Sequence, residues 1–570
     1  MMALGRTRWW FAASLVVAAS YGCLALAEAF SGPYVVQDDA RQHVFWMSRF
    51  LDPGLFPGDL IADYFQSVAP AGYTAFYRLL AGVGLQPQVV NKLLPLALGI
   101  VGTAYCFRLS MLLCPVPFAA WISTVLLNQK LWLTTALVSG TPRAFLVVTF
   151  LAFLYYLARK SVIPCLATIV LQGLLYPQLV FVMAGVLAVR CVAWGPWPPR
   201  LISDRQTRRL CLAGLVTACA VLAPYAVQTS AFGPVITEAE ARQWPEFQPG
   251  GRTTFFHAHP WTFWITGQRS GMFPSALPVL MGVGLLLPFL LRLRSRLTLA
   301  DAVDRERASL LTQTAWASLA MFAAAHAVLF HLFFPSRYTE HSLPVVLALA
   351  SGIALVILLD AVCHWVGPRA GRLALSRQQL AAGLAIALGI AVLGYPALLW
   401  AGGASFPRTS YKVGREPALY AFLAAQPRDS FIASLSSEAD YLPTFAQRPV
   451  LTAREYAIPL HLSYYRQIRT RVMDLIQAQY SPDFSTVSSF IDRYGVDFWL
   501  LDREAFRADY LDAHAWAKQF QPLTADASNR LKQGPAPALS MVMDRCAAFS
   551  GERVVLLDAT CVVNAAGADS

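Results

Sequence analysis

Charged side chains are scarce in this chain of 570 residues. Aspartate, glutamate, lysine and arginine make up only 14% of the sequence, whereas hydrophobic residues make up 56%. Because soluble domains carry about 25% charged residues, the composition excludes an ordinary soluble enzyme. The apolar residues gather in blocks close to the roughly 20 residues that a helix needs to cross a bilayer. The sequence therefore predicts a polytopic α-helical membrane protein.

Motifs for metal ions, phosphates and nucleophiles are also missing. The ten cysteines show no CxxC pair and no Cys/His spacing typical of a structural metal site. The polar C-terminal part has neither a glycine-rich phosphate loop nor a nucleophile elbow, and no internal repeat is visible. We predict no metal-ligating residues and leave a divalent cation open as a cofactor. An oxidising compartment would permit a disulfide between Cys546 and Cys561, but spacing alone does not decide it.

The positive charges follow the pattern that orients membrane helices. The net charge is +12, but the arginines form short clusters between apolar blocks, which favours cytoplasmic loops over a nucleic-acid-binding surface. Arg6 and Arg8 place the N-terminus in the cytoplasm. Alternating the apolar blocks against these clusters predicts about eleven transmembrane helices and an external C-terminus. The pair Tyr176-Pro177 predicts a helix break, because proline lacks a backbone donor.

Two parts of different composition are expected. Residues 1–405 form the membrane part, with external loops at 31–90 and 229–270. Residues 406–570 alternate helical and extended patterns, which predicts a small extracytoplasmic α/β domain. Helices are expected at 416–426, 463–478 and 482–494, and strands at 430–435, 448–452, 496–501, 539–543 and 554–558.

The first external loop opens with two adjacent carboxylates, Asp38 and Asp39. One of them is a candidate general base, which would take a proton from the hydroxyl of an acceptor substrate. The alternative is helix capping, because Asp39 precedes the helical stretch ARQHVFWMSRFL and aspartate is a preferred N-cap residue. Both readings stay open at the level of sequence.

A second acidic pair, Asp59 and Asp63, follows in the same loop. Residues four apart share one face of a helix, so both side chains are candidates for substrate binding. The alternative is the solvated face of an interfacial helix.

A short turn between two long apolar blocks contains Arg337, Tyr338 and His341. At a membrane surface an arginine pairs well with a phosphate or diphosphate, so this turn is a candidate substrate-binding site. Arg143, in the turn SGTPR, is a further candidate by the same reasoning. The alternative is an interfacial anchor, since arginine and tyrosine are common at the ends of membrane helices.

These features together resemble the GT-C superfamily of membrane glycosyltransferases, which includes protein mannosyltransferases and the aminoarabinose transferases of lipid A. The resemblance rests on Asp38-Asp39 after the first helix, amphipathic segments in the same loop, about eleven helices and an external C-terminal domain. It implies a polyprenyl-phosphate sugar as donor, inversion at the sugar and one of the two aspartates as catalytic base. It also implies that Arg337 binds the donor phosphate, and it points to a bacterial inner-membrane branch.

The predicted activity is transfer of a sugar from a lipid-linked donor to an extracytoplasmic acceptor, which is a glycolipid, a polysaccharide or a protein. A transporter or flippase for a lipid-linked or small polar substrate is the main alternative, although it would favour ionisable residues within the helices and symmetric halves. A non-catalytic member of the same scaffold that binds glycolipid is the third.

Overall fold

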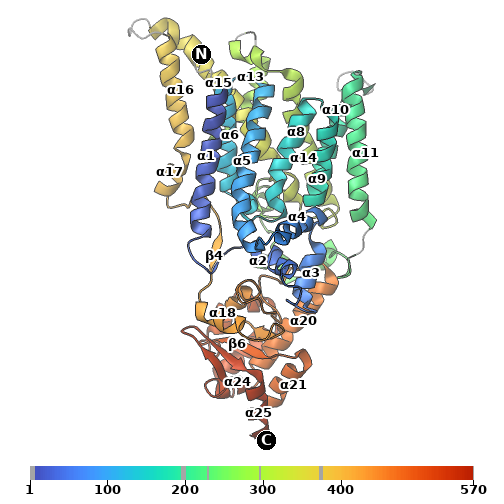
Figure 1. The fold of residues 1–570 in the computed structure, drawn as a ribbon, viewed down its shortest axis with the longest axis vertical. Coiled ribbons are helices and arrows are strands. Elements are labelled where there is room, and N and C mark those ends of the chain that lie inside the picture. The colour runs from blue at the N-terminus through green and yellow to red at the C-terminus, as the bar shows by residue number, and fades with distance from the viewer. Residues whose placement is uncertain are drawn as a thin grey trace.

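Long helices lie side by side in one half of the molecule, and a smaller part with a β-sheet extends from one end (Figure 1). This computed structural model describes residues 7–193, 200–227, 230–293, 295, 297–370 and 377–568. Arg6, and residue 229 at the start of the second expected external loop, lie outside these ranges.

Four helical segments of the described chain are long and apolar enough to cross a bilayer. They are α1 (Thr7–Ala29), α5 (Pro87–Leu113), α11 (Arg205–Val227) and Pro335–Trp365, most of which belongs to α15 (Ser342–Ala370). The bent pair α16 (Arg377–Leu393) and α17 (Tyr395–Ala401) adds a fifth if it forms one span. The chain is a multi-pass membrane protein, and the number of about eleven helices stays a prediction.

Shorter helices complete the membrane part. They are α6 (Pro117–Trp132), α7 (Thr135–Val138), η3 (Pro142–Phe145), α8 (Leu146–Ala158), α9 (Val162–Leu175), α10 (Gln178–Cys191), η6 (Val279–Leu286), α13 (Leu287–Arg292), η8 (Thr298–Ala302) and α14 (Arg305–Ala327). Two short strands, β2 (Val192–Ala193) and β3 (Arg200–Leu201), pair antiparallel beside them.

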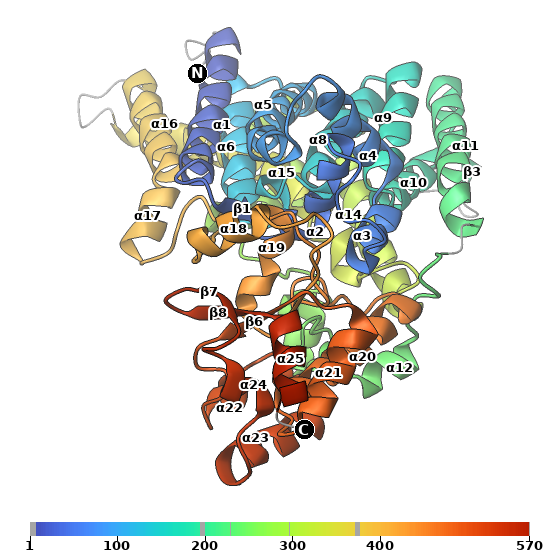
Figure 2. The ribbon, with the colours of Figure 1, turned by 60° about the horizontal axis from the view of Figure 1, so that its bottom comes forward.

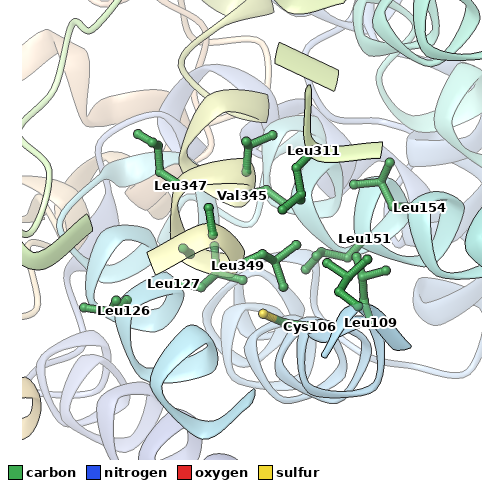
Figure 3. Close-up of a cluster of buried hydrophobic side chains, with 14 of the residues drawn as sticks. Cys106, Leu109, Leu126, Leu127, Leu151, Leu154, Leu311, Val345, Leu347 and Leu349 are labelled. Atoms are coloured by element: carbon green, nitrogen blue, oxygen red, sulfur yellow. The ribbon is translucent and has the colours of Figure 1, made fainter. Parts of the chain in front are cut away.

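Helix α15 forms the centre of the bundle. Figure 3 shows Val345, Leu347 and Leu349 of α15 among leucines from α5, α6, α8 and α14. Gly352 allows α15 to approach α6 closely, because a Cβ atom there would lie 2.1 Å from Ser123 Oγ and 2.5 Å from the carbonyl oxygen of Ala119.

The predicted break at Tyr176-Pro177 is confirmed, since α9 ends at Leu175 and α10 begins at Gln178. Gln172 Nε2 donates to the carbonyl oxygen of Tyr176 at 2.9 Å, and Gln172 Oε1 accepts from Thr149 at 2.5 Å. These bonds satisfy backbone and side-chain groups that the interrupted helix leaves inside the bundle.

The first loop lies between the membrane part and the C-terminal part. It contains β1 (Val35–Gln37), α2 (Ala40–His43), η2 (Phe45–Phe50), α3 (Leu60–Val68) and α4 (Ala71–Gly82). Strand β1 pairs antiparallel with β4 (Tyr411–Val413), so that Gln37 faces Tyr411. This pairing fixes the position of Asp38 and Asp39, which follow directly after β1.

The second loop, from residue 230, contains α12 (Glu238–Gln243), η4 (Pro245–Phe247) and the π-helix η5 (Thr262–Thr266). Farther along the chain, η9 (Pro335–Tyr338) precedes α15. Phe255 and Phe247 of this loop pack against Phe330, which anchors the loop to the end of α14.

The C-terminal part is built on a four-stranded sheet with the order β5-β6-β8-β7. The strands are β5 (Ile432–Ser434), β6 (Phe498–Asp502), β7 (Ala547–Ser550) and β8 (Val554–Asp558); β5 and β6 are parallel and the other pairs antiparallel. Its helices are α18 (Pro417–Ala424), η11 (Ser437–Asp440), α19 (Leu442–Phe445), α20 (Leu462–Gln479), α21 (Phe484–Tyr494), α22 (Tyr510–Ala513), η12 (Ala517–Gln519), α23 (Leu523–Gln533), α24 (Ala538–Val542) and α25 (Ala559–Ala568).

Most of the elements expected in this part are confirmed, with two corrections. The segment 539–543 forms helix α24 instead of a strand, because a short apolar run is compatible with either. The segment 448–452 makes only an isolated bridge, from Val450 to Ile432. The disulfide between Cys546 and Cys561 is present.

One hydrophobic cluster joins the first loop to the C-terminal part. Phe45 packs against Tyr456, and the ring of Tyr64 stacks on that of Tyr464 at 3.6 Å. This shared core holds the two parts together through large buried aromatic side chains. The boundary at residue 406 as the start of a separate domain stays a prediction.

Candidate active site at the first loop

Asp39 does not cap the helix that follows it. Its carboxylate makes no hydrogen bond to the start of α2, and Gln37 Oε1 accepts from the backbone N–H of Asp39 at 2.8 Å and of Ala40 at 3.3 Å. The carboxylate of Asp39 instead accepts from Arg143 Nη2 at 2.6 Å. The capping interpretation is therefore wrong for the Asp39 side chain, which pairs with Arg143 and not with the start of α2.

Asp39 is ionised at neutral pH. Burial alone would raise the pKa of Asp39, but the opposing charges of Arg143, Arg337 and Arg252 outweigh it and lower the pKa below its ordinary value. Nearby His43 has its pKa lowered to about 4 by burial, so its imidazole is neutral at pH 7.

Four arginines converge near Asp39 from three segments of the chain. Arg143 lies in η3 and Arg337 in η9, and both are substrate-binding candidates from the sequence, whereas Arg252 and Arg269 come from the second loop. The Arg269 guanidinium lies over the ring of Phe334, 5.6 Å from its centre, and donates two long hydrogen bonds, of 3.4 Å to the carbonyl oxygen of Thr254 and 3.5 Å to Gln268 Oε1. The sequence analysis did not identify Arg252 and Arg269. The only local feature that could have indicated them is an arginine close to glycine in the expected second external loop.

Among the residues that the structure describes, no carboxylate forms an ion pair with Arg269. Burial and the positive charges of Arg337, Arg252 and Arg143 lower the pKa of Arg269, and the attraction of Asp39 only partly opposes them. An arginine in such surroundings stays protonated, so the arrangement favours binding of an additional anion.

Several buried polar atoms in this region have no hydrogen-bond partner among the described residues. They are Tyr176 Oη, Ser270 Oγ, Arg337 Nε and His341 Nε2. Tyr176, at the break between α9 and α10, lies near Arg337 and Arg143. Because native structures leave few buried polar groups unsatisfied, this set fits a ligand rich in oxygen atoms.

The turn that carries Arg337 is held by its neighbours. Arg337 Nη1 donates to Glu340 at 2.6 Å, and His341 lies 3.9 Å from the same carboxylate. Tyr338 is fully buried, and its hydroxyl donates to the carbonyl oxygen of Leu332 at 2.6 Å. Tyr338 therefore orients the turn.

Asp38 points into a different cluster. Its carboxylate pairs with buried Arg41, which also contacts Glu455 at 3.0 Å and Asp440 at 3.8 Å. Arg252 binds Glu455 at 3.3 Å and thus links this cluster to the arginines around Asp39. Glu455 and Asp440 belong to the C-terminal part, which sequence reasoning did not connect with the first loop.

Asp59 and Asp63 lie on α3, in other surroundings. Asp59 Oδ2 caps α3 by accepting from the N–H of Ala62 at 2.7 Å, and burial raises the pKa of Asp59 to about 6. Asp63 is 46% exposed and pairs with Arg49 at 2.8 Å. The charges that act most on Asp59 are Arg471 and Arg49, whereas Arg143 acts most on Asp39.

A metal centre is not formed by the side chains that the structure describes. No group of three or more histidine, cysteine, aspartate or glutamate residues in these ranges is arranged to hold a metal ion. Arg41 lies among Asp38, Asp440 and Glu455, so a cation already occupies the place between these carboxylates.

Comparison with solved structures identifies the fold. The oligosaccharyltransferase of Archaeoglobus fulgidus in its apo form aligns with a TM-score of 0.52 and 12% identity, over 92% of this chain and 73% of that one. The same enzyme tethered to an acceptor peptide with the NVT sequon gives a TM-score of 0.54 and 13% identity, over 91% and 72%. Archaeal oligosaccharyltransferase AglB of that organism, in complex with an inhibitory peptide and a dolichol-phosphate, gives a TM-score of 0.53 and 10% identity, over 91% of this chain and 72% of that one.

These identities are low enough that the likeness shows the fold alone. The chain shares the fold of this archaeal oligosaccharyltransferase. No protein-family model and no curated protein matches it in sequence.

Proposed function

We propose that this chain is a membrane glycosyltransferase that moves a sugar from a polyprenyl-phosphate donor to an extracytoplasmic acceptor, with inversion at the sugar. The observation that carries the proposal is the contact of Asp39 with Arg143 inside a group of arginines. A carboxylate base and an anion-binding group in one place are what such a transfer needs. The shared fold adds support, because one solved neighbour contains a dolichol-phosphate.

Arg337, Arg143 and Arg269 bind the donor phosphate in this proposal. Guanidinium groups pair with phosphate oxygens bidentately, and a phosphate supplies the anion that Arg269 lacks. The unsatisfied atoms Tyr176 Oη and His341 Nε2 are available to complete its hydrogen bonds.

Asp39 is the proposed general base, in preference to Asp38. It accepts the proton of the acceptor hydroxyl as the oxygen of that hydroxyl forms a bond to C1 of the sugar. The bond from C1 to the phosphate oxygen breaks, and its electron pair stays on the phosphate, where the arginines stabilise the charge. Asp38 holds Arg41 toward the C-terminal part.

In this proposal Asp63 contacts the acceptor and Asp59 positions the helix that carries it. Asp63 is exposed enough to touch an acceptor, and Asp59 fixes α3, on which Asp63 lies. Tyr338 positions the turn of Arg337.

The C-terminal part lies outside the cytoplasm in the proposed topology, at the outer face of a bacterial inner membrane, with the N-terminus inside. The disulfide of Cys546 and Cys561 supports this side, because disulfides persist in oxidising compartments. Labelling of a single introduced cysteine at Arg530 with a membrane-impermeant maleimide tests it, and labelling only after lysis would contradict it.

The proposed function is tested by Asp39→Asn in purified membranes supplied with radiolabelled polyprenyl-phosphate sugars. Removal of a general base is expected to reduce transfer by about 10²–10⁴-fold, whereas Asp38→Asn should have a smaller effect. Asp474→Asn is a matched control, because Asp474 also pairs with an arginine, Arg493 at 2.8 Å, but in α20.

Unchanged transfer in Asp39→Asn would refute the base assignment. Wild-type protein that binds the lipid-linked sugars but transfers none of them would instead favour a glycolipid-binding protein of the same fold.

A further inference from the structure

A polar groove of about 910 Å³ lies where the C-terminal part meets the membrane part. One wall is formed by residues 411–418, which run from β4 into α18, and the opposite wall by Glu552 and Arg553 in the turn between β7 and β8. Figure 2 shows α18 on the side of the β7–β8 hairpin that faces the membrane helices, and Phe422 of α18 packs on Phe549 of β7 at 5.6 Å. The volume falls within the roughly 300–1,000 Å³ that is common for ligand pockets.

Charged side chains of both signs line this groove without pairing with one another. Lys412, Arg415 and Arg553 supply positive charge, and Glu416 and Glu552 supply negative charge. Among the residues that the structure describes, none of these five side chains has an ion-pair partner. A purely anionic ligand would be repelled by the two glutamates, and a cation would be repelled by the lysine and the two arginines.

Two tyrosine rings complete the lining. Tyr411 and Tyr441 lie in the groove, and the Tyr441 ring also covers the guanidinium of Arg41 at 4.8 Å from its centre. Because Arg41 pairs with Asp38, Tyr441 links the lining of the groove to the first loop through one side-chain contact.

We propose that this groove binds a hydroxyl-rich oligosaccharide, the acceptor of the transfer. Sugar hydroxyl groups both donate and accept hydrogen bonds, so in one site they can accept from lysine and arginine and donate to the carboxylates. The apolar faces of sugar rings pack on tyrosine, which presents a rigid aromatic surface with a polar end. The inference rests on the proposed function and narrows its acceptor to a saccharide.

The test uses full-length protein in detergent and fluorescently labelled linear tri- to hexasaccharides of glucose, mannose, galactose and N-acetylglucosamine. Fluorescence anisotropy measures binding, with labelled random nonapeptides as the comparison. At least one saccharide should bind the wild type, and the affinity should change by less than about twofold between low and high salt, since the ligand is neutral.

Arg415→Gln and Arg553→Gln, at exposed positions that tolerate change, should each weaken this binding by about fivefold to tenfold. Arg530→Gln is the control, because Arg530 is a partly exposed arginine of α23 outside the groove. Asp39→Asn should still bind the saccharide, so loss of transfer and loss of acceptor binding are told apart.

The proposal is overturned if no saccharide binds, if both groove variants bind as the wild type does, or if the peptides bind in place of saccharides. It is also overturned if only anionic probes, or anionic lipids in nanodiscs, compete for the groove. Each of these outcomes leaves the test of Asp39 as the base unaffected, because binding is measured without turnover.

Discussion

Replacing Arg269 with glutamine is expected to change stability and donor binding in opposite directions. The Arg269 guanidinium faces the positive charges of Arg337, Arg252 and Arg143 and the single negative charge of Asp39. In the protein without donor, its charge therefore opposes folding, and the same charge is what the donor phosphate would use.

The size of the effect follows from Coulomb's law. At separations of about 10 Å and an effective dielectric constant of about 20, each pair of charges contributes about 1.7 kcal/mol. Three repulsions less one attraction leave about 3 kcal/mol of net repulsion. Loss of the contact with the Phe334 ring returns about 1 kcal/mol, so Arg269→Gln should stabilise the protein without donor by about 2 kcal/mol.

Donor binding should fall in the same variant. Loss of one charge-assisted hydrogen bond to phosphate costs about 1.5–3 kcal/mol, which is about a tenfold to hundredfold weaker Kd. Thermal unfolding in detergent, with and without added polyprenyl phosphate, measures both effects, since a ligand stabilises the folded protein by an amount that grows with the logarithm of its concentration over Kd. Arg530→Gln is the control for removal of an arginine outside this group.

The reasoning is refuted if Arg269→Gln unfolds at a lower temperature than the wild type and gains as much from the lipid phosphate. Arg269 would then serve only to pack on Phe334, and the group of arginines would not be an anion-binding site.

Three further predictions concern stability. Burial raises the pKa of Asp59 to about 6 from an ordinary 3.8, so the free energy of unfolding should fall as pH rises from about 4 to 6. Asp59→Asn, which keeps the cap, should raise the free energy of unfolding at pH 8 by up to about 3 kcal/mol, seen as a higher Tm, and leave Tm unchanged at pH 4. Arg41→Gln leaves the carboxylates of Asp38, Asp440 and Glu455 without the buried cation between them and should cost about 3 kcal/mol, seen as a lower Tm; an unchanged Tm would contradict it. Cys546→Ser opens a loop with a sequence separation of 15 and should cost about 3 kcal/mol, measured as faster proteolysis of the C-terminal part, and a reductant should have the same effect on the wild type but none on the variant.

Local sequence patterns were sufficient for the secondary structure of the C-terminal part. Strand β8 runs from Val554 to Asp558 as expected, since a continuous apolar run bounded by polar residues is typical of a buried strand. The same criterion failed for 539–543, where Pro537 starts helix α24 and only the tertiary structure decides between helix and strand. The number of spans was harder still, because helices buried inside a bundle need not be long or continuously apolar.

The site could be predicted only in the pieces that carry local signals. Asp39 and Arg143 were found because each lies in a short polar segment beside apolar blocks, but their contact at 2.6 Å depends on how α2 and η3 pack. Arg252 and Arg269 lie in a long loop whose path the sequence does not specify. Glu455 lies more than 400 residues after Arg41 along the chain, so the pair is visible only once the C-terminal part is placed against the first loop.

The ion pair of Asp39 and Arg143 suggests how donor binding would prepare the base. While Arg143 donates to Asp39, the pKa of this carboxylate is held low, and a carboxylate of low pKa is a weak base. A donor phosphate competes for Arg143 and also places negative charge near Asp39, and both effects raise the pKa of Asp39. An acceptor that arrives before the donor therefore meets a weak base, whereas an acceptor that arrives after it meets a stronger one. Under the proposed function, the arginines that hold the leaving phosphate thus also delay proton removal until a donor is in place.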